Sequence, residues 1–367
     1  MKNTYGPAIS VTIFGESNGA EIGAVIDGIS PGLRIDEEYI RHSLDLRRPY
    51  GRISTARCEA DPFRIVSGAF NGYTTGTPLT IIIPNNDTKS GDYKALADIP
   101  RPGHADYTAY CKYHGYQDYR GGGHFSGRIT AALVAAGALM RSVLLENKGI
   151  KIGTHISRLS GISDRAITAD DIDALEHKRF PVLDGDAEAA MIKEIEAAAN
   201  SGDSIGGVLE TIITGVPAGV GEPFFDSMES ALSHMMFSIP GIKGVEFGAG
   251  FGFADMRGSC ANDPFTVKDD RIITETNNNG GINGGITNGM PIVFRCAVKP
   301  TPSIYKEQDS VRLSTMEQEK LSVSGRHDPA IIHRARAVVD AAAAIVIADM
   351  LAIRFGTDYL SIEVRHE

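Results

Sequence analysis

The sequence predicts an α+β protein, a β-α-β sandwich in which long central helices lie between antiparallel sheets. Segment 335–355 has helical periodicity and only four charged residues, which is typical of a helix buried on all sides. Segment 127–146 is a second long helix with an apolar stripe and many small residues that allow close packing. Short apolar segments bounded by Gly and Pro precede both helices, as expected for strands.

In chain order, the first expected elements are a short strand and a helix. Residues 10–14 alternate in the manner of a strand. Asp36 is a typical N-cap residue, and the helix after it ends near Leu46. Gly356 provides a C-cap for the last long helix. The other expected elements are a loop at 47–57, strands at 63–67, 78–84, 208–215 and 291–299, and an acidic surface helix at 181–200.

A faint internal repeat relates the two halves of the chain. In each half, Asn-Gly and a Gly-x-Pro turn lead into an apolar strand that ends at Pro84 or Pro300. Ser-Gly-Arg and an Ala-rich helix then follow. Chance similarity between two Gly/Pro-rich stretches is the alternative. Because no Pro/Ser-rich linker separates the halves, we expect residues 1–367 to form a single domain with an internal pseudo-repeat.

Composition excludes several classes of function. The net charge is −10, Trp is absent and no long basic stripe occurs, so nucleic acid is not an expected partner. No run of 18 uncharged apolar residues and no signal-peptide pattern is present, so we expect no membrane association and a cytoplasmic location. The widely separated cysteines are typical of reduced thiols and do not suggest a zinc site or disulfide framework. They are Cys58, Cys111, Cys260 and Cys296.

An arginine segment at 46–57 is basic, although the chain as a whole carries a net negative charge. It contains four arginines, with no acidic residue between Asp45 and Glu59. The guanidinium fork fits carboxylate and phosphate oxygens two at a time. The segment is therefore either a seat for a small, multiply anionic ligand or a solvated basic loop that pairs with nearby acids.

Four other segments combine glycine with titratable side chains: 14–19, 101–106, 120–128 and 325–329. The third enters a helix N-terminus, where amides and the helix dipole favour an anion. His104, in the second, is either a proton donor near neutral pH or a capped loop histidine. Gly-rich stretches at 248–252 and elsewhere match neither a P-loop nor a dinucleotide fingerprint.

These motifs, taken with their neighbours, resemble the chorismate synthase family nearly from end to end. The matching strings include IGAVIDGISPGL, LRRP, SGAFNGYTTGTPL, RPGHADYT, RGGG, SIPGIKGVEFG, MRGSCANDPF and GRHDP. The resemblance implies a carbon–oxygen lyase of the shikimate pathway that eliminates phosphate from 5-enolpyruvylshikimate 3-phosphate to give chorismate. It also implies a requirement for reduced FMN and a homotetramer. No extra segment for reducing flavin with NADPH is evident, so we expect an external source of reduced flavin.

The resemblance also implies roles for individual residues, and no metal. The substrate-binding positions are Ser17, Arg48, Arg52, Arg101, Ser126, Arg128 and Arg326, with Arg57 shaping the loop. The positions that contact flavin are Asn262, Lys299, Ser303, Arg326 and Asp328. His104 matches the histidine that supports the reduced, anionic flavin, and Asp328 matches the acidic residue that removes the ring proton.

The chain departs from the family pattern at two places. Asn18 stands at the catalytic position of a histidine thought to protonate the departing phosphate. Asparagine cannot deliver a proton, so we expect slow turnover unless His124 substitutes for that histidine. His124 itself stands where many relatives have arginine, so substrate affinity should fall as this side chain loses its proton. The alternatives are a non-catalytic flavin- or substrate-binding relative, and a phosphoryl-transfer enzyme that would need a P-loop or an acidic metal site.

Overall fold

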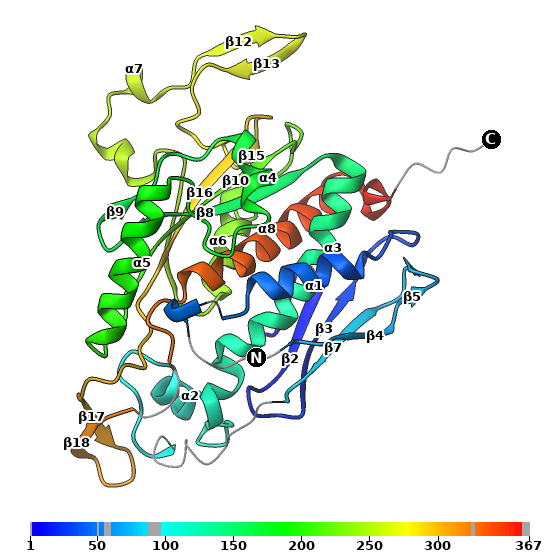
Figure 1. Ribbon diagram of the computed structural model, residues 1–367. Helices are drawn as coiled ribbons and strands as arrows, with labels where there is room; N and C mark the ends of the chain where they lie inside the picture. The colour runs from blue at the N-terminus through cyan, green and yellow to red at the C-terminus, as the bar shows by residue number, and fades with distance from the viewer. Residues whose placement is uncertain (1, 50, 55–59, 87–96, 324–326, 362–367) are drawn as a thin grey trace.

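Two five-stranded antiparallel sheets form the outer layers of the protein (Figure 1). The computed structural model describes residues 2–49, 51–54, 60–86, 97–323 and 327–361, and only the backbone at Arg52. The first sheet has the order β1 (Thr4–Tyr5), β2 (Ser10–Gly15), β3 (Glu21–Asp27), β7 (Leu79–Pro84), β4 (Arg64–Ser67). The second has the order β11 (Ile242–Phe247), β16 (Ile292–Val298), β10 (Gly207–Thr214), β8 (Lys151–Leu159), β9 (Ile162–Ser163).

Two long helices fill the space between the sheets. Helix α3 (Thr130–Lys148) packs on β3 and β7, and α8 (Ile332–Phe355) packs on β8 and β10. The helices also pack on each other, so closely that a Cβ at Gly137 would lie 2.3 Å from the Ala341 carbonyl oxygen. The expected sandwich with buried central helices is confirmed.

The two halves share one topology. The order β2-β3-β7-β4 in the first sheet corresponds to β8-β10-β16-β11 in the second, with both series in the same chain order. Helix α1 (Glu37–Leu46) lies between β3 and β4 in the chain and packs on α3. Helix α6 (Met228–Ser238) lies between β10 and β11 and packs on α8. The internal repeat is thereby confirmed.

Most predicted elements occur close to their expected bounds. The Asp36 side chain caps α1 by accepting a hydrogen bond from the Tyr39 N–H at 2.9 Å. The acidic helix α5 (Gly185–Asn200) begins later than predicted, because the Asp184 carboxylate accepts hydrogen bonds from the N–H groups of the first turn. Segment 250–255 is a short 3₁₀ turn, in agreement with the absence of a dinucleotide-binding helix.

The remaining described elements are short. The strands are β5 (Ala69–Phe70), β6 (Tyr73–Thr74), β12 (Phe265–Lys268), β13 (Arg271–Thr274), β14 (Ile282–Asn283), β15 (Ile286–Thr287), β17 (Gln308–Arg312) and β18 (Glu317–Leu321). The helices are α2 (Asp106–Tyr113), α4 (Ile172–Leu175) and α7 (Gly258–Ala261). The strands β12 and β13 extend away from the body together with α7 (Figure 1).

Helix α8 also fastens the start of the chain. The buried Asp349 carboxylate accepts hydrogen bonds from the N–H groups of Ala8 at 3.0 Å and Ile9 at 2.8 Å. Burial raises the pKa of Asp349, and these two hydrogen bonds partly oppose the rise. The segment that leads into β2 is therefore tied to the middle of the last helix.

Within the described residues, one helical stretch, Gly127–Lys148, is long and apolar enough to cross a membrane, but 83% of its apolar window is buried inside the protein. Such burial is typical of a core helix in a soluble protein, and α3 occupies that position here.

Candidate active site

Two equivalent connections meet at one end of the sandwich. We call residues 85–129, which run from β7 to α3, the first crossover, and residues 299–331, which run from β16 to α8, the second crossover. Lys299 Nζ donates a hydrogen bond to the Gly103 carbonyl oxygen. Ser310 Oγ donates to the Pro100 carbonyl oxygen at 2.5 Å. In Figure 1, α2 of the first crossover and β17–β18 of the second lie at the same corner of the molecule.

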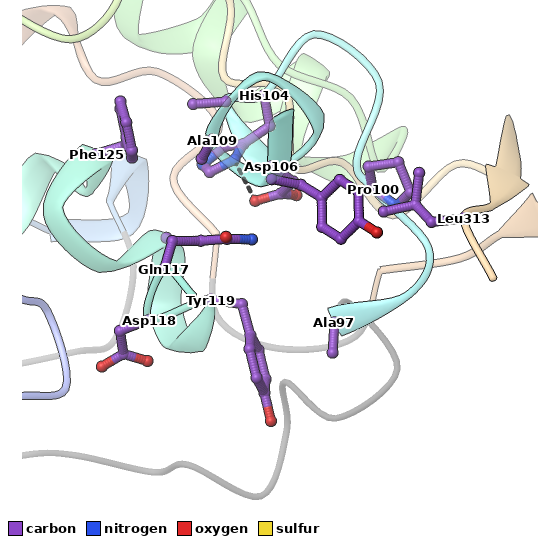
Figure 2. Close-up of a pocket in the computed structure, with 13 residues that line it drawn as sticks. Ala97, Pro100, His104, Asp106, Ala109, Gln117, Asp118, Tyr119, Phe125 and Leu313 are labelled. Carbon is purple, nitrogen blue, oxygen red and sulfur yellow. Dashed lines mark ion pairs between the residues drawn. The ribbon is translucent and has the colours of Figure 1, made fainter. Parts of the chain in front are cut away.

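An Arg–Asp–His group forms the centre of the first crossover. Arg101 Nε and Nη2 bind the two Asp106 carboxylate oxygens at 2.8 and 2.9 Å. His104 Nδ1 lies 2.6 Å from Asp106 Oδ1, the contact drawn as a dashed line in Figure 2. Arg101 Nη1 also donates to Ser303 Oγ of the second crossover at 3.1 Å. The structure thus brings together three predicted site residues, Arg101, His104 and Ser303.

The ionised form of Asp106 is strongly favoured in this group. Burial acts to raise the pKa of Asp106, but hydrogen bonds and charge from Arg101 and His104 outweigh it. The pKa of this carboxyl group is therefore held well below its usual range. Asp106 keeps its negative charge at any pH at which the protein would work.

A turn of three glycines separates His104 from the end of β2. Gly121, Gly122 and Gly123 all have positive φ, at +60°, +84° and +53°. A Cβ at Gly121 would lie 2.6 Å from Asn18 Nδ2, and one at Gly122 would lie 3.1 Å from His104 Cε1. The missing side chains therefore allow the backbone to lie between the two side chains that the family pattern places in catalysis.

Ser17, beside this turn, has a buried side-chain hydroxyl without a partner among the described residues. Its backbone N–H donates to the Gly123 carbonyl oxygen at 3.1 Å. Its side chain is fully buried, and Oγ has no hydrogen-bond partner among the described residues. A buried hydroxyl without a partner costs about 1–3 kcal/mol, so retaining one favours a ligand that binds it. The predicted role of Ser17 in binding fits this observation.

His124, the residue after the glycine turn, contacts the end of β2. Its Nδ1 is 2.8 Å from the Gly15 carbonyl oxygen, which can only accept, so Nδ1 carries a proton. Gly121, by contrast, is the residue of this turn that approaches Asn18. His124 therefore contacts Gly15, the last residue of β2.

The arginine segment is anchored by a buried acid. Arg47 and Arg128 both bind the buried Asp61 carboxylate, Arg47 Nη1 at 3.1 Å. Arg128 Nε also donates to Asn85 Oδ1 at 2.9 Å. Arg48 is more exposed and pairs with Asp45 at 2.5 Å. Arg47 thus fixes the arginine segment to the start of α3, whereas the Arg48 side chain lies closer to the surface.

The substrate positions at the start of α3 have internal roles in this structure. Ser126 Oγ caps the turn Gly127–Ile129 by accepting from the Arg128 N–H at 3.2 Å. Contact of Ser126 and Arg128 with substrate stays a prediction. Arg57 and Arg326, and the Arg52 side chain, lie outside the described residues.

The flavin positions of the second half are only partly gathered. Lys299 lies beside the first crossover, and burial followed by repulsion from Lys243 lowers the pKa of its ammonium group. Asp328 forms an ion pair with Arg334, whose Nε donates to the Arg47 carbonyl oxygen at 2.9 Å.

Asn262 is not part of this gathering. It is an exposed residue at the end of α7, and α7 and α2 lie at opposite ends of the molecule in Figure 1.

Sequence reasoning missed the roles of Asp106 and Asp61. Asp106 follows His104 by two residues within the motif RPGHADYT, in which the sequence predicted roles for Arg101 and His104 but none for Asp106. Nothing in the sequence around Asp61 indicates that it binds two arginines.

A hollow beside His104 and Asp106 is also lined by Gln117 and Tyr119 (Figure 2), and the buried Gln117 Oε1 has no hydrogen-bond partner within the described segments. In the parts of the chain that the structure describes, no three His, Cys, Asp or Glu side chains gather as a metal site.

Fold and site together define an α+β protein with a partly buried Arg–Asp–His group beside a glycine turn, an arrangement typical of an enzyme active site. Comparison with known proteins gives this class a family. The chorismate synthase family model matches residues 9–352. Chorismate synthase of Pyrococcus abyssi is 46% identical over 349 residues, which is 95% of this chain and 97% of that protein.

Two further relatives agree. Chorismate synthase of Dehalococcoides mccartyi is 46% identical over 358 residues, covering 97% of this chain and 98% of that protein. A crystal structure of chorismate synthase superposes with a TM-score of 0.75 at 29% identity, covering 96% of this chain and 94% of the other. The chain belongs to the chorismate synthase family, and this membership supports chorismate synthase function, that of a lyase in aromatic biosynthesis.

Proposed function

We propose that this protein eliminates phosphate from 5-enolpyruvylshikimate 3-phosphate to give chorismate, with reduced FMN as cofactor. In this 1,4-elimination one C–H and one C–O bond break and a new C=C bond forms, while a proton and inorganic phosphate leave, so nothing is oxidised overall. The observation that carries the proposal is the meeting of the two crossovers, where Arg101, His104, Lys299 and Ser303 gather from the family's motifs.

The residues present fit a flavin and a trianionic substrate. Ser17 offers a buried hydroxyl that has no partner among the described residues, and His104 lies on the other side of the glycine turn from it. Lys299 offers a positive charge next to Gly103, the residue before His104. Lys299, Ser303 and Asp328 would hold the flavin, and Asp328 would take the ring proton. Reduced FMN, when bound, supplies electron density to the allylic system as phosphate leaves.

The direct test is chorismate formation with photoreduced FMN under anaerobic conditions. We expect slow turnover by the wild-type chain, because Asn18 cannot protonate the departing phosphate. No chorismate from the wild type or from Asn18→His, with flavin and substrate still bound, would instead show a non-catalytic binding relative.

Asn18→His should raise the turnover of the chain. A positioned general acid contributes about 10²- to 10⁴-fold, so we expect an increase of at least about 10²-fold at neutral pH. The imidazole replaces an amide that already lies beside Gly121. Equal rates for the two proteins would show that a histidine is not needed at this position.

We also propose a cytoplasmic homotetramer that draws reduced flavin from an external source and binds neither nucleic acid nor membrane. Support for assembly comes from large apolar side chains left exposed on and near the α7–β12–β13 extension: Phe251, Phe265, Val267 and Ile272. Since Asn262 ends α7, and α7 lies far from α2 and β17–β18 of the crossovers in Figure 1, its contact with flavin would require a neighbouring copy. Sedimentation analysis tests this, and a stable monomer would contradict it.

A further inference from the structure

We propose that Asp106 is a positioning residue that holds the His104 ring with Nδ1 protonated and so makes Nε2 the atom that exchanges a proton in the site. This inference rests on the proposed function for its catalytic consequence, whereas its structural part can be tested without flavin or substrate.

The distances select one tautomer of His104. An ionised carboxylate can only accept hydrogen bonds, and its Oδ1 lies 2.6 Å from Nδ1, so that nitrogen must carry a proton. Arg101 Nη2 is also near Nδ1, at 3.1 Å. A bare Nδ1 accepting from Arg101 would place its lone pair against the carboxylate oxygen. With Nδ1 protonated, both Nδ1 and Nη2 instead donate to Asp106 Oδ1, Nη2 at 2.9 Å.

Arg101 fixes the carboxylate that fixes the histidine. Its Nε binds Asp106 Oδ2 at 2.8 Å, and its backbone N–H binds the same oxygen at 3.0 Å. Its Nη1 is tied to Ser303 of the second crossover at 3.1 Å. The side chains of Arg101 and Asp106 are nearly buried, so water competes little for these hydrogen bonds. The carboxylate therefore has one orientation, and the imidazole that binds it has one as well.

The glycine turn keeps the other edge of the ring accessible. A Cβ at Gly122 would lie 3.3 Å from His104 Nε2 and 3.1 Å from Cε1. The residue before it, Gly121, faces Ser17 and Asn18. His104 Nε2 thus faces one side of the glycine turn. The Ser17 hydroxyl and the Asn18 amide, which stands at the family's general-acid position, face the other side. In the neutral ring Nε2 accepts a proton, and in the imidazolium it donates one.

The tautomer can be measured on the free protein. In ¹⁵N-labelled enzyme, long-range ¹H–¹⁵N correlations identify which ring nitrogen carries the proton once the ring is neutral, and a His104→Gln variant assigns the signal. We expect Nδ1 as the protonated nitrogen in the wild type, and a loss or reversal of this pattern in Asp106→Asn. Protonation at Nε2 in the wild type, or an even mixture, would overturn the inference without any variant having to fold.

Kinetics test the catalytic consequence. We expect Asp106→Asn to lower kcat about 10²-fold, the lower end of what a general acid or base contributes, with KM close to that of the wild type. The matched control is Asp171→Asn, because Asp171 also binds an arginine with both oxygens but no histidine. An unchanged kcat in Asp106→Asn, or an equal loss in the control, would overturn the inference. A wild type that makes no chorismate would reject the proposed function and leave the tautomer measurement standing.

Discussion

The two crossovers occupy the same place in the repeat, yet they differ in what they do. The first crossover folds around Asp106 and carries the histidine, the arginine and the glycine turn. The second crossover contributes single groups, such as Ser303 and Lys299, that reach over to the first. Repetition therefore places two loops at one end of the sandwich: the first carries His104 and Asp106, and the second braces it through Ser303 and Lys299 and also contains Asp328.

The helices that follow the crossovers differ in a related way. The start of α3 is held by the buried Asp61, through Arg128. The start of α8 reaches across to the arginine segment, where the ring of His333 lies 2.7 Å from Ser54 Oγ. The first half thus supplies the anchor, and the second half packs on it. The expected effects below test this division from the largest to the smallest.

Removing the charge of Asp61 should have the largest effect on stability. Asp61→Asn removes the buried carboxylate that Arg47 and Arg128 both bind, which costs about 3–5 kcal/mol. Urea unfolding measures the loss. In Asp45→Asn, whose carboxylate forms a more exposed pair with Arg48, we expect less than about 1 kcal/mol. Similar losses in both variants would remove the distinction between a buried anchor and surface pairing.

The glycine turn should tolerate a methyl group poorly. In Gly123→Ala the new Cβ would lie 2.0 Å from the Asp118 carbonyl oxygen, at a φ of +53°. Strain and displacement should cost about 2–3 kcal/mol and most of the activity. Gly127→Ala is the control, because beyond its chain neighbours no atom of the described residues lies within 4 Å of its Cβ position, and its φ is not positive. An active, stable Gly123→Ala protein would show that the turn does not need its present path.

Acid should weaken the hold of α8 through His333. Burial, helped by the charge of Arg334, lowers the pKa of His333 to about 3. The unfolded chain takes up this proton near pH 6.5, whereas the folded protein does not until the pH reaches the folded pKa. Above pH 6.5 this residue therefore does not change the free energy of unfolding, and below it the free energy of unfolding falls by about 1.4 kcal/mol per pH unit, down to the folded pKa. His333→Asn should remove this part of the slope between pH 6.5 and 4.5.

The exposed His114 provides the control for the pH series. Its φ of +56° suits asparagine, so His114→Asn should keep the wild-type slope. If His333→Asn also kept that slope, His333 would not be the residue that carries this acid sensitivity.

The smallest effect is expected at the brace. Ser303→Ala removes the oxygen that accepts from Arg101 Nη1 and should cost about 1 kcal/mol. Ser314→Ala, at an exposed contact between the same crossovers, should cost less than about 0.5 kcal/mol. A larger loss in Ser314→Ala would mean that the exposed contact is the one that braces the crossovers.

The sequence predicted elements whose signals are local. Asp36 caps α1 as expected, and the few charges of 335–355 identified the buried helix α8. The strands at 21–27 and 151–159 were not predicted. Both have residues buried on two faces or by neighbouring segments, so the alternation that reveals a strand is lost.

At the site, the sequence indicated which residue types gather but not how they pair. The motif at 101–106 contains Arg101, His104 and Asp106. Their pairing, however, depends on the turn that brings Arg101 back onto Asp106, which the sequence does not show. The Asp61 anchor joins residues 14 and 67 positions away, which no local pattern can show. Long-range pairing of this kind is set by the tertiary fold.

The tie between Asp349 and the N–H groups of Ala8 and Ile9 bears on how the protein is made. The ribosome synthesises the first strands hundreds of residues before α8, so the first sheet of the nascent chain initially lacks the hydrogen bonds from Ala8 and Ile9 to Asp349. This contact can form only after α8 has been synthesised, and a polypeptide cut short before α8 would lack it however well its early strands had paired.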